Sequence, residues 1–216
     1  EYIKGDKSIA ELIASWIEND KQISVLNLSG IPYNILDVVI GVLSNLIFDT
    51  VYYALKIDDK KYEGRPLLIC YEEAHRYLNA GTQNSFSQNA VERIMKEGRK
   101  FGLGAMIISQ RPVEIPNTII SQVSTFIALR LTNSEDQSKI ISFAPNNFSM
   151  FLKSLPSLGN GDAFVIGESM KIPMKVKIPL LDTVKNINFA AKIGAWNQDK
   201  PNGLSYNDTI IRWMQK

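Results

Sequence analysis

Apolar residues recur along this chain with two alternating periods, one typical of helices and one typical of buried strands. Spacings of three and four residues predict amphipathic helices at residues 8–20, 34–55 and 89–101. Short apolar runs bounded by turn or polar residues predict strands at residues 22–30, 67–70, 105–109 and 125–131. This alternation favours βαβ units, and therefore an α/β fold with a mostly parallel sheet flanked by helices.

The pattern changes in the second half of the chain. A short helix is expected at residues 115–123, a second at 133–143, and a third that begins at Asn146 or Asn147 and ends at Lys153. Residues 162–167 and 173–179 predict a terminal β-hairpin, and residues 206–214 a last amphipathic helix. We therefore assign residues 1–182 to one α/β unit and residues 183–216 to a helical tail.

Composition and net charge limit the classes of protein to which this chain can belong. The chain has 216 residues and a net charge of only +2, so bulk charge neither requires nor excludes a nucleic-acid partner. The single cysteine, Cys70, is expected to be a buried thiol. The longest apolar stretches, around residues 38–48 and 105–108, are too short or too polar to cross a bilayer. We expect a cytoplasmic protein that contacts no membrane. Because the sequence starts without Met, we also expect a fragment or a processed product.

Two carboxylates follow the apolar run at residues 67–70. Glu72 and Glu73 would stand beyond the carboxyl end of a buried parallel strand, where open α/β sheets bind their ligands. One acid can hold Mg²⁺ while the other deprotonates an attacking water, as in the Walker B strand of an ATPase. The alternative is an acidic helix start, which the helix dipole would favour.

Gln110 closes the next predicted strand. Neighbouring strand tips lie only about 5 Å apart, so its amide could contact both a terminal phosphate and the attacking water. The alternative is an amide that caps the turn at Arg111 and Pro112. The two polar strand ends together favour a nucleotide site.

Arginines near the end of the helix at residues 89–101 form a third candidate feature. Arg99 lies beside glycines and could act as an arginine finger on the nucleotide of another subunit, with Arg93 as the second candidate. The alternative is a solvated arginine, with Arg93 paired to Glu97 four residues on. The only histidine, His75, is expected to be structural or to couple these features, because one histidine cannot build a multi-histidine metal site.

The phosphate-binding loop G-x-x-x-x-G-K-S/T does not occur in this sequence. The only comparable segment, residues 102–104, lacks both the spacing and the lysine. If the chain is part of an ATPase, we expect this loop in sequence N-terminal to Glu1.

Three segments in order resemble the HerA family of hexameric DNA translocases, which is related to FtsK. They are residues 71–75 (YEEAH), 97–102 (EGRKFG) and 109–112 (SQRP), and the resemblance extends over residues 23–179. It implies the C-terminal half of a RecA-like motor domain. Within it, Glu72 would be the metal-side acid, Glu73 the catalytic base, Gln110 the sensor and Arg99 the trans-acting finger, with Arg93 as a further nucleotide contact. The first acid is Glu where the family more commonly has Asp.

The resemblance also implies cofactors and partners. These are ATP and Mg²⁺, a homohexameric ring, double-stranded DNA, and either a NurA-like nuclease or a sirtuin-like effector of anti-phage defence. Residues 79–88 are a candidate pore loop, although an inert surface loop fits equally because the segment lacks Lys and Arg. Two other functions remain open: a scaffold module that assembles an effector without hydrolysis, and a ring ATPase that moves protein.

Overall fold

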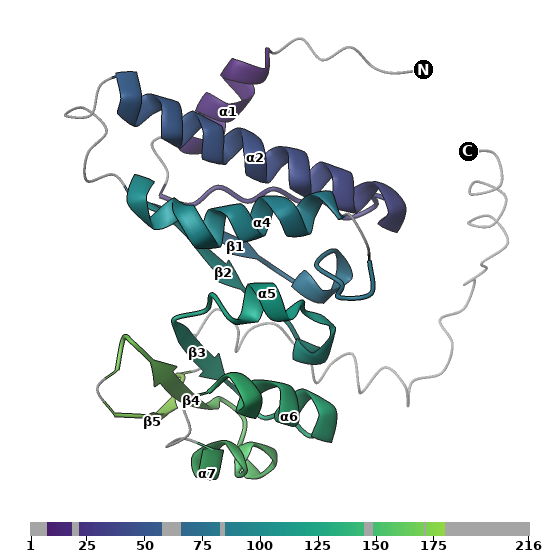
Figure 1. Ribbon diagram of the computed structural model, residues 1–216, viewed down its shortest axis with the longest axis vertical. Coiled ribbons are helices and arrows are strands. Elements are labelled where there is room, and N and C mark those ends of the chain that lie inside the picture. Colours follow the sequence, from purple (N-terminus) through teal and green to yellow (C-terminus); the bar gives the residue numbers. More distant parts are fainter. Residues whose placement is uncertain are drawn as a thin grey trace, which may run out of the picture. The chain divides into compact units, whose positions relative to one another are not determined.

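The computed structural model describes residues 8–18, 22–57, 66–82, 85–144, 149–170 and 172–179 (Figure 1). The chain divides into two units, Glu1–Val176 and Lys177–Lys216. The predicted tail and its helix lie outside the described residues, so both stay predictions.

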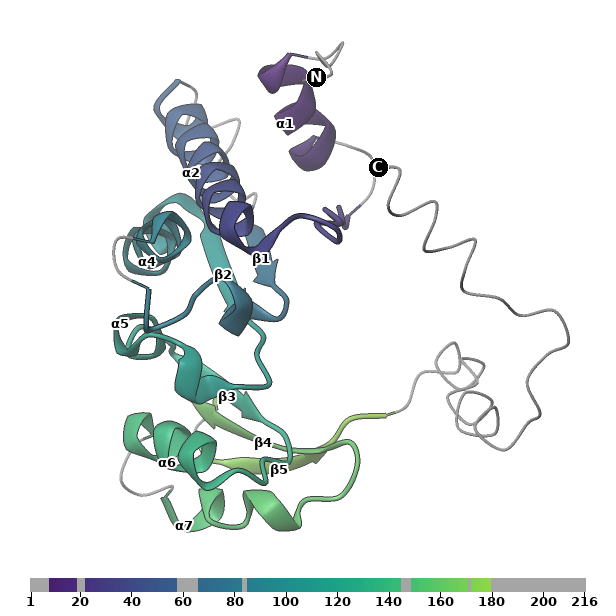
Figure 2. The same cartoon turned by 90° about the vertical axis from the view of Figure 1, so that its right-hand side faces the viewer.

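Two helices and a pair of parallel strands form the first part of the fold. Helix α2 (Tyr33–Ile57) is followed by strand β1 (Leu67–Tyr71), helix α4 (Phe86–Glu97) and strand β2 (Leu103–Ile107). β1 and β2 pair in parallel, as the alternating pattern predicts. Both helices lie on the same side of this strand pair (Figure 2), and their apolar faces are joined by clusters that include Phe48, Ile94 and Leu103.

The second part of the fold is built around an antiparallel sheet. Strand β3 (Thr125–Ala128) pairs antiparallel with β4 (Asp162–Gly167), and β4 neighbours β5 (Met174–Lys177). The predicted terminal hairpin is therefore confirmed. Helix α6 (Ser134–Phe143) and the short helix α7 (Ser149–Leu152) follow β3. Leu152, Leu155, Phe164 and Ile166 are among the buried residues of this part.

Short helices connect these elements. One-turn 3-10 helices occur at η1 (Ala74–Arg76), η2 (Gly98–Phe101), η3 (Pro112–Glu114) and η5 (Leu155–Ser157). The helix expected at residues 115–123 is only α5 (Asn117–Ile120), which Pro116 precedes. At the N-terminus, Ser8 begins α1 (Ile9–Ile17) with a complete capping box.

The strand predicted at residues 22–30 is wrong. Residues 23–28 are assigned to no strand, and Ile23 and Val25 are 79% and 84% exposed. An apolar run forms a strand only where a neighbouring edge accepts its hydrogen bonds, and no described strand pairs with this segment. The turn at Ser29 and Gly30 is present, with Gly30 at a φ of 86°.

The expected burial of Cys70 is also wrong. Side chains along β1 alternate in exposure, with Leu68 and Cys70 on the exposed side. The helices α2 and α4 cover one face of the β1–β2 pair, and no described segment buries the other. The strand therefore has the pattern of a half-covered sheet although its sequence is continuously apolar.

Helix α2 is longer than the apolar stretch expected there. By length and composition alone, the part from Ile35 to Ile57 could cross a membrane. One face of the helix packs against α4 in the same core, where Phe48 is only 2% exposed, whereas apolar side chains such as Val42 and Tyr53 are exposed on the described structure.

Candidate functional site

The carboxyl ends of β1 and β2 lie side by side. Their register pairs Tyr71 with Ile107, and backbone hydrogen bonds continue past the strands, from Ile108 N to Tyr71 O at 3.0 Å and from Ala74 N to Ile108 O at 2.9 Å. Glu72 and Glu73 follow one strand, and Ser109 and Gln110 follow the other. The two polar strand ends that the sequence predicts are therefore brought together.

Glu73 is held in an unusual backbone conformation. Its φ of 49° and ψ of 42° are left-handed, and it is the only non-glycine residue with positive φ in the described segments. Such a conformation costs roughly 1–2 kcal/mol for a residue with a Cβ. The turn presents the side chain to the neighbouring strand tip, where Gln110 Nε2 donates a 2.7 Å hydrogen bond to Glu73 Oε1. Strain at a site of this kind is typical of functional positions.

Glu72 points to solvent and has a free carboxylate. Its backbone carbonyl accepts a hydrogen bond from the Tyr77 hydroxyl at 2.9 Å, whereas its side chain has no ionic or hydrogen-bond partner in the described part of the chain. Burial raises the pKa of the Tyr77 hydroxyl, and electrostatic interaction with the Tyr71 hydroxyl and with the carboxylates of Glu72 and Glu73 raises it further, so Tyr77 stays a hydrogen-bond donor.

The residues at this edge suit a magnesium ion that is shared with a nucleotide. The described residues hold no cluster of three or more His, Cys, Asp or Glu side chains that could enclose a metal ion. Mg²⁺ does not need such a cage, because it usually binds one or two carboxylates, several waters and the substrate phosphates. The free Glu72 carboxylate beside Glu73 matches this donor set.

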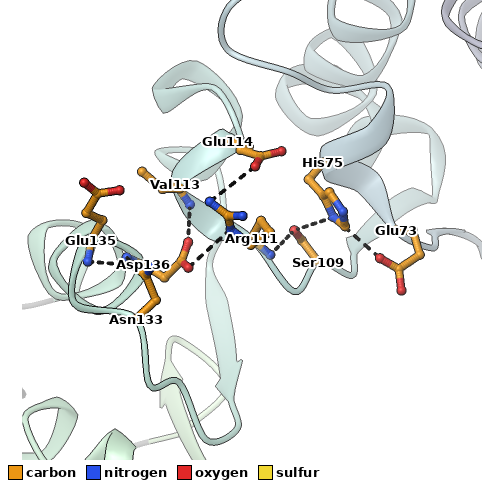
Figure 3. Close-up of polar contacts among 9 residues, drawn as sticks. All are labelled: Glu73, His75, Ser109, Arg111, Val113, Glu114, Asn133, Glu135 and Asp136. Carbon is orange, nitrogen blue, oxygen red and sulfur yellow. Dashed lines mark hydrogen bonds and ion pairs between the residues drawn. The ribbon is translucent and has the colours of Figure 1, made fainter. Parts of the chain in front are cut away.

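His75 joins the two strand tips through a second route. Its Nδ1 lies 3.6 Å from Glu73 Oε2 and 3.3 Å from Ser109 Oγ, which also accepts a 3.0 Å hydrogen bond from Arg111 N (Figure 3). Both carboxylate oxygens of Glu73 thus have a neighbour from this polar network. His75 thus contacts residues that follow both strands, which is compatible with either the structural or the coupling role expected of it, and Ser109 is a further member of this network.

A groove of about 740 Å³ opens beside these residues. Glu72, Glu73 and Gln110 line one end of it, and apolar side chains of β3 such as Ile127 line another part. Among the described strands, β2 pairs only with β1, and β3 pairs only with β4, so the two strands flank the groove without meeting. The β2 and β3 edges that face the groove have no strand partner within these residues.

The two candidate arginines have different surroundings. Arg99 lies exposed in η2, and the described segments give it no ion pair. Arg93 is held against α2, with Nη1 3.1 Å from Asp49 Oδ1 and its guanidinium carbon 4.0 Å from the centre of the Phe48 ring. The alternative pairing of Arg93 with Glu97 is therefore wrong, because α2 supplies both the carboxylate of Asp49 and the ring face of Phe48 to this guanidinium. These contacts place Arg93 at the α2–α4 interface, and neither arginine contacts Glu73.

The loop expected at residues 79–88 is shorter in the structure. Helix α4 starts at Phe86, and Ser85 is its N-cap. Asp37 of α2 fixes this start by accepting hydrogen bonds from Ser85 Oγ, Ser87 Oγ at 2.7 Å and the amides of Phe86 and Ser87 at 3.1 Å. Burial alone would raise the pKa of Asp37, but these hydrogen bonds outweigh burial and lower it.

Comparison with known proteins identifies the family of the chain. The family model for the helicase HerA-like C-terminal region matches residues 56–209. The chain belongs to the HerA-like helicase family. The HerA-like region includes all the candidate site residues, although the match starts later than the resemblance recognised from residue 23.

Curated relatives of this HerA-like chain are archaeal helicases. It is 35% identical over 113 residues to the DNA double-strand break repair helicase HerA of Pyrococcus furiosus, covering 52% of this chain and 20% of that protein. It is 29% identical over 181 residues to the HerA of Saccharolobus solfataricus, covering 82% of this chain and 35% of that protein. The chain thus spans only a fifth to about a third of these relatives.

Solved structures support the fold of the HerA-like chain. The genome packaging NTPase B204 of Sulfolobus turreted icosahedral virus 2 superposes with a TM-score of 0.55 at 16% identity, over 78% of this chain and 72% of that one. VirB4 of Thermoanaerobacter pseudethanolicus gives a TM-score of 0.51 at 14% identity, over 74% and 41% of the two chains. Both likenesses agree with part of a RecA-like ATPase core.

Proposed function

We propose that this chain is the C-terminal part of an ATP-driven DNA translocase or helicase motor of the HerA type. The observation that carries the proposal is the contact of Glu73 with Gln110 at two adjacent strand tips, next to the free carboxylate of Glu72. A base and an amide at that distance suit the positioning and deprotonation of one water. Glu72 would hold Mg²⁺, and Gln110 would sense the terminal phosphate.

The rest of the nucleotide site comes from other segments in this proposal. The phosphate-binding loop, absent from these 216 residues, would be supplied by sequence N-terminal to Glu1. Two observations support this: the matched parts cover only 20% and 35% of these two curated relatives, and within the described residues the strand edges on both sides of the groove beside Glu73 are unpaired. Arg99 would contact the nucleotide of a neighbouring subunit in a homohexameric ring around double-stranded DNA.

The proposed cellular role is DNA end processing. Relatives named as double-strand break repair helicases support action on DNA. We further propose that the motor works in the cytoplasm together with a nuclease of the NurA kind. An anti-phage system with a sirtuin-like or other effector is the alternative setting for the same motor.

Steady-state ATP hydrolysis by the complete gene product, with and without duplex DNA, tests the proposal. We expect DNA to stimulate turnover and Glu73→Gln to abolish it, with Glu135→Gln, an exposed acid on α6, as the matched control. Turnover that does not respond to DNA would favour a motor that moves protein. If a sample that contains the upstream segment shows no turnover, the proposed function would change from a motor to a scaffold that assembles an effector.

A further inference from the structure

The turn that carries Gln110 is anchored from both sides. On one side, Ile108 hydrogen-bonds to the end of β1, and Ser109 Oγ contacts His75 Nδ1 at 3.3 Å. On the other side, the 3-10 helix η3 begins at Pro112, immediately after Arg111. The direction of the Gln110 side chain therefore depends on how η3 and Arg111 are held.

Asp136 of α6 supplies that second anchor. Its Oδ1 accepts a 3.0 Å hydrogen bond from Val113 N, the amide of the second residue of η3, and its Oδ2 lies 3.6 Å from Arg111 Nε (Figure 3). Arg111 is held further by Glu114, with 3.4 Å between Nη2 and Oε1. One carboxylate thus fixes both the backbone and the side chain that follow Gln110.

The burial of Asp136 needs an explanation. Only 3% of its side-chain surface is exposed, and a buried carboxylate is costly unless its oxygens are paired. Helix α6 does not need Asp136 as its cap, because Asn133 Oδ1 already accepts from the amides of Glu135 and Asp136. The partners of the Asp136 carboxylate lie instead in the turn after Gln110.

We propose that Asp136, acting through Arg111 and Val113, is a positioning residue that holds Gln110 against Glu73. This inference rests on the proposed function, in which Glu73 is the base and Gln110 the sensor. Asp136 lies at the wall of the groove, but both of its carboxylate oxygens face Val113 and Arg111 and only 3% of its side chain is exposed, so it would act on the rate of hydrolysis and leave binding unchanged. The polar chain from Glu73 through His75, Ser109 and Arg111 to Asp136 would then link the site to the start of α6.

Asp136→Asn in the complete gene product tests this role. The amide oxygen can still accept from Val113 N, but the charge that faces Arg111 is lost. We expect kcat to fall by about 10- to 100-fold, as for a misplaced catalytic group, and KM for ATP to change by less than about twofold, since binding contacts are retained. Asp162→Asn is the matched control, because Asp162 also accepts a backbone amide and pairs with a cation, Lys175, but lies away from the strand tips.

A double variant separates positioning from a general loss of structure. If Asp136 acts through Gln110, adding Asp136→Asn to Gln110→Ala lowers kcat no further than Gln110→Ala alone. If the decrease in kcat of the double variant instead equals the product of the decreases of the two single variants, the inference is overturned. A fall in kcat that Asp162→Asn reproduces would also overturn it.

Amide hydrogen exchange gives a readout that does not need turnover. Residues 108–114 should exchange faster in Asp136→Asn than in the wild type or in Asp162→Asn, and unchanged exchange there would refute the anchoring role. If Glu73→Gln and Gln110→Ala leave turnover intact while this exchange changes, the proposed function fails and the anchor stands. If both lower turnover while Asp136→Asn alters neither kcat nor exchange, only the anchor fails.

Discussion

Gln110 Nε2 donates a 2.7 Å hydrogen bond to Glu73 Oε1, joining residues that follow two parallel strands. The amide oxygen of Gln110 stays available to accept from a water, while its nitrogen orients the carboxylate that would deprotonate that water. In this arrangement the base is oriented by the residue that would also sense the phosphate. In the proposed motor, the pair would make hydrolysis depend on how β1 and β2 are placed relative to each other.

The two adjacent acids are expected to have separable roles. Glu73→Gln should lower turnover by at least about 100-fold, because a general base is removed, while the Mg²⁺–nucleotide complex still binds. Glu72→Gln should instead raise the Mg²⁺ concentration needed for half-maximal turnover, because it removes the free carboxylate suited to the metal. Nucleotide binding and Mg²⁺ titrations on both variants check this, and an unchanged Mg²⁺ requirement in Glu72→Gln would contradict the assignment.

Substitution of Arg99 is expected to affect turnover, whereas substitution of Arg93 is expected to affect stability. Arg99→Ala should slow turnover by about 10³-fold, as for the loss of an arginine finger, and leave the ring assembled. Arg93→Ala should mainly lower the free energy of unfolding, by about 1 kcal/mol, because it loses Asp49 and the Phe48 ring. Lys100→Ala, an exposed cation beside Arg99 in η2, is the control.

Mixing subunits tests whether Arg99 acts between them. Rings assembled from Arg99→Ala and Glu73→Gln subunits should recover part of the turnover, because one subunit keeps the base and its neighbour keeps the arginine. Absence of recovery in mixed rings would show that Arg99 acts within its own subunit or has another role. A rate defect in Arg93→Ala with unchanged stability would move the finger to Arg93.

The sequence predicts the site because its parts follow strand ends. Parallel strands place their carboxyl ends at one edge, so an acid pair after one apolar run and an amide after the next are expected to meet. Helix caps lie next to the helices that they start: Asn133 begins α6, and Ser8 begins α1, where the sequence allows either Asp6 or Ser8 as the cap. For these caps the physical cause lies within a few residues of its effect.

Contacts between distant segments have no such local sign. Asp37 caps a helix that starts 49 residues later, and Asp136 holds an amide 23 residues earlier. Cys70 and Val25 show a second limit of prediction from sequence. Residues of an apolar run are buried only if another segment of the chain covers them. The described residues do not cover either one.

Gly41 is expected to be irreplaceable on α2. Glycine inside a helix usually costs stability, so Gly→Ala would normally stabilise by about 0.5–1 kcal/mol. Here a Cβ would lie 2.7 Å from both the carbonyl carbon and the Cβ of Phe86, at the start of α4. Gly41→Ala should therefore destabilise by about 1–3 kcal/mol through overpacking, as measured by urea denaturation. Val42→Ala, exposed on the same helix, is the control, and stabilisation by Gly41→Ala would mean that the two helices pack less closely.

Asp37 should make stability fall in acid. Its pKa in the folded protein is lowered from the ordinary value of 3.8, so its contribution is fully present above about pH 5 and is lost as the pH falls through the folded-state pKa. Asp37→Asn should cost about 1.5–3 kcal/mol at pH 7, since a charged acceptor is removed from Ser85, Ser87 and Phe86. The variant should also lose less further stability than the wild type between pH 5 and 3.

Free energies of unfolding at several pH values, for the wild type and Asp37→Asn, measure this difference. Asp49→Asn removes a carboxylate from the same helix. Among the described residues this carboxylate pairs with Arg93 alone, and it is about half-exposed, so a smaller loss of stability is expected at pH 7. Equal losses in the two variants would mean that any acid on α2 contributes alike. A larger loss with Asp37→Asn that fades as the pH falls would establish that the charged cap holds α4 against α2, and with it the helix layer on which the strands of the site rest.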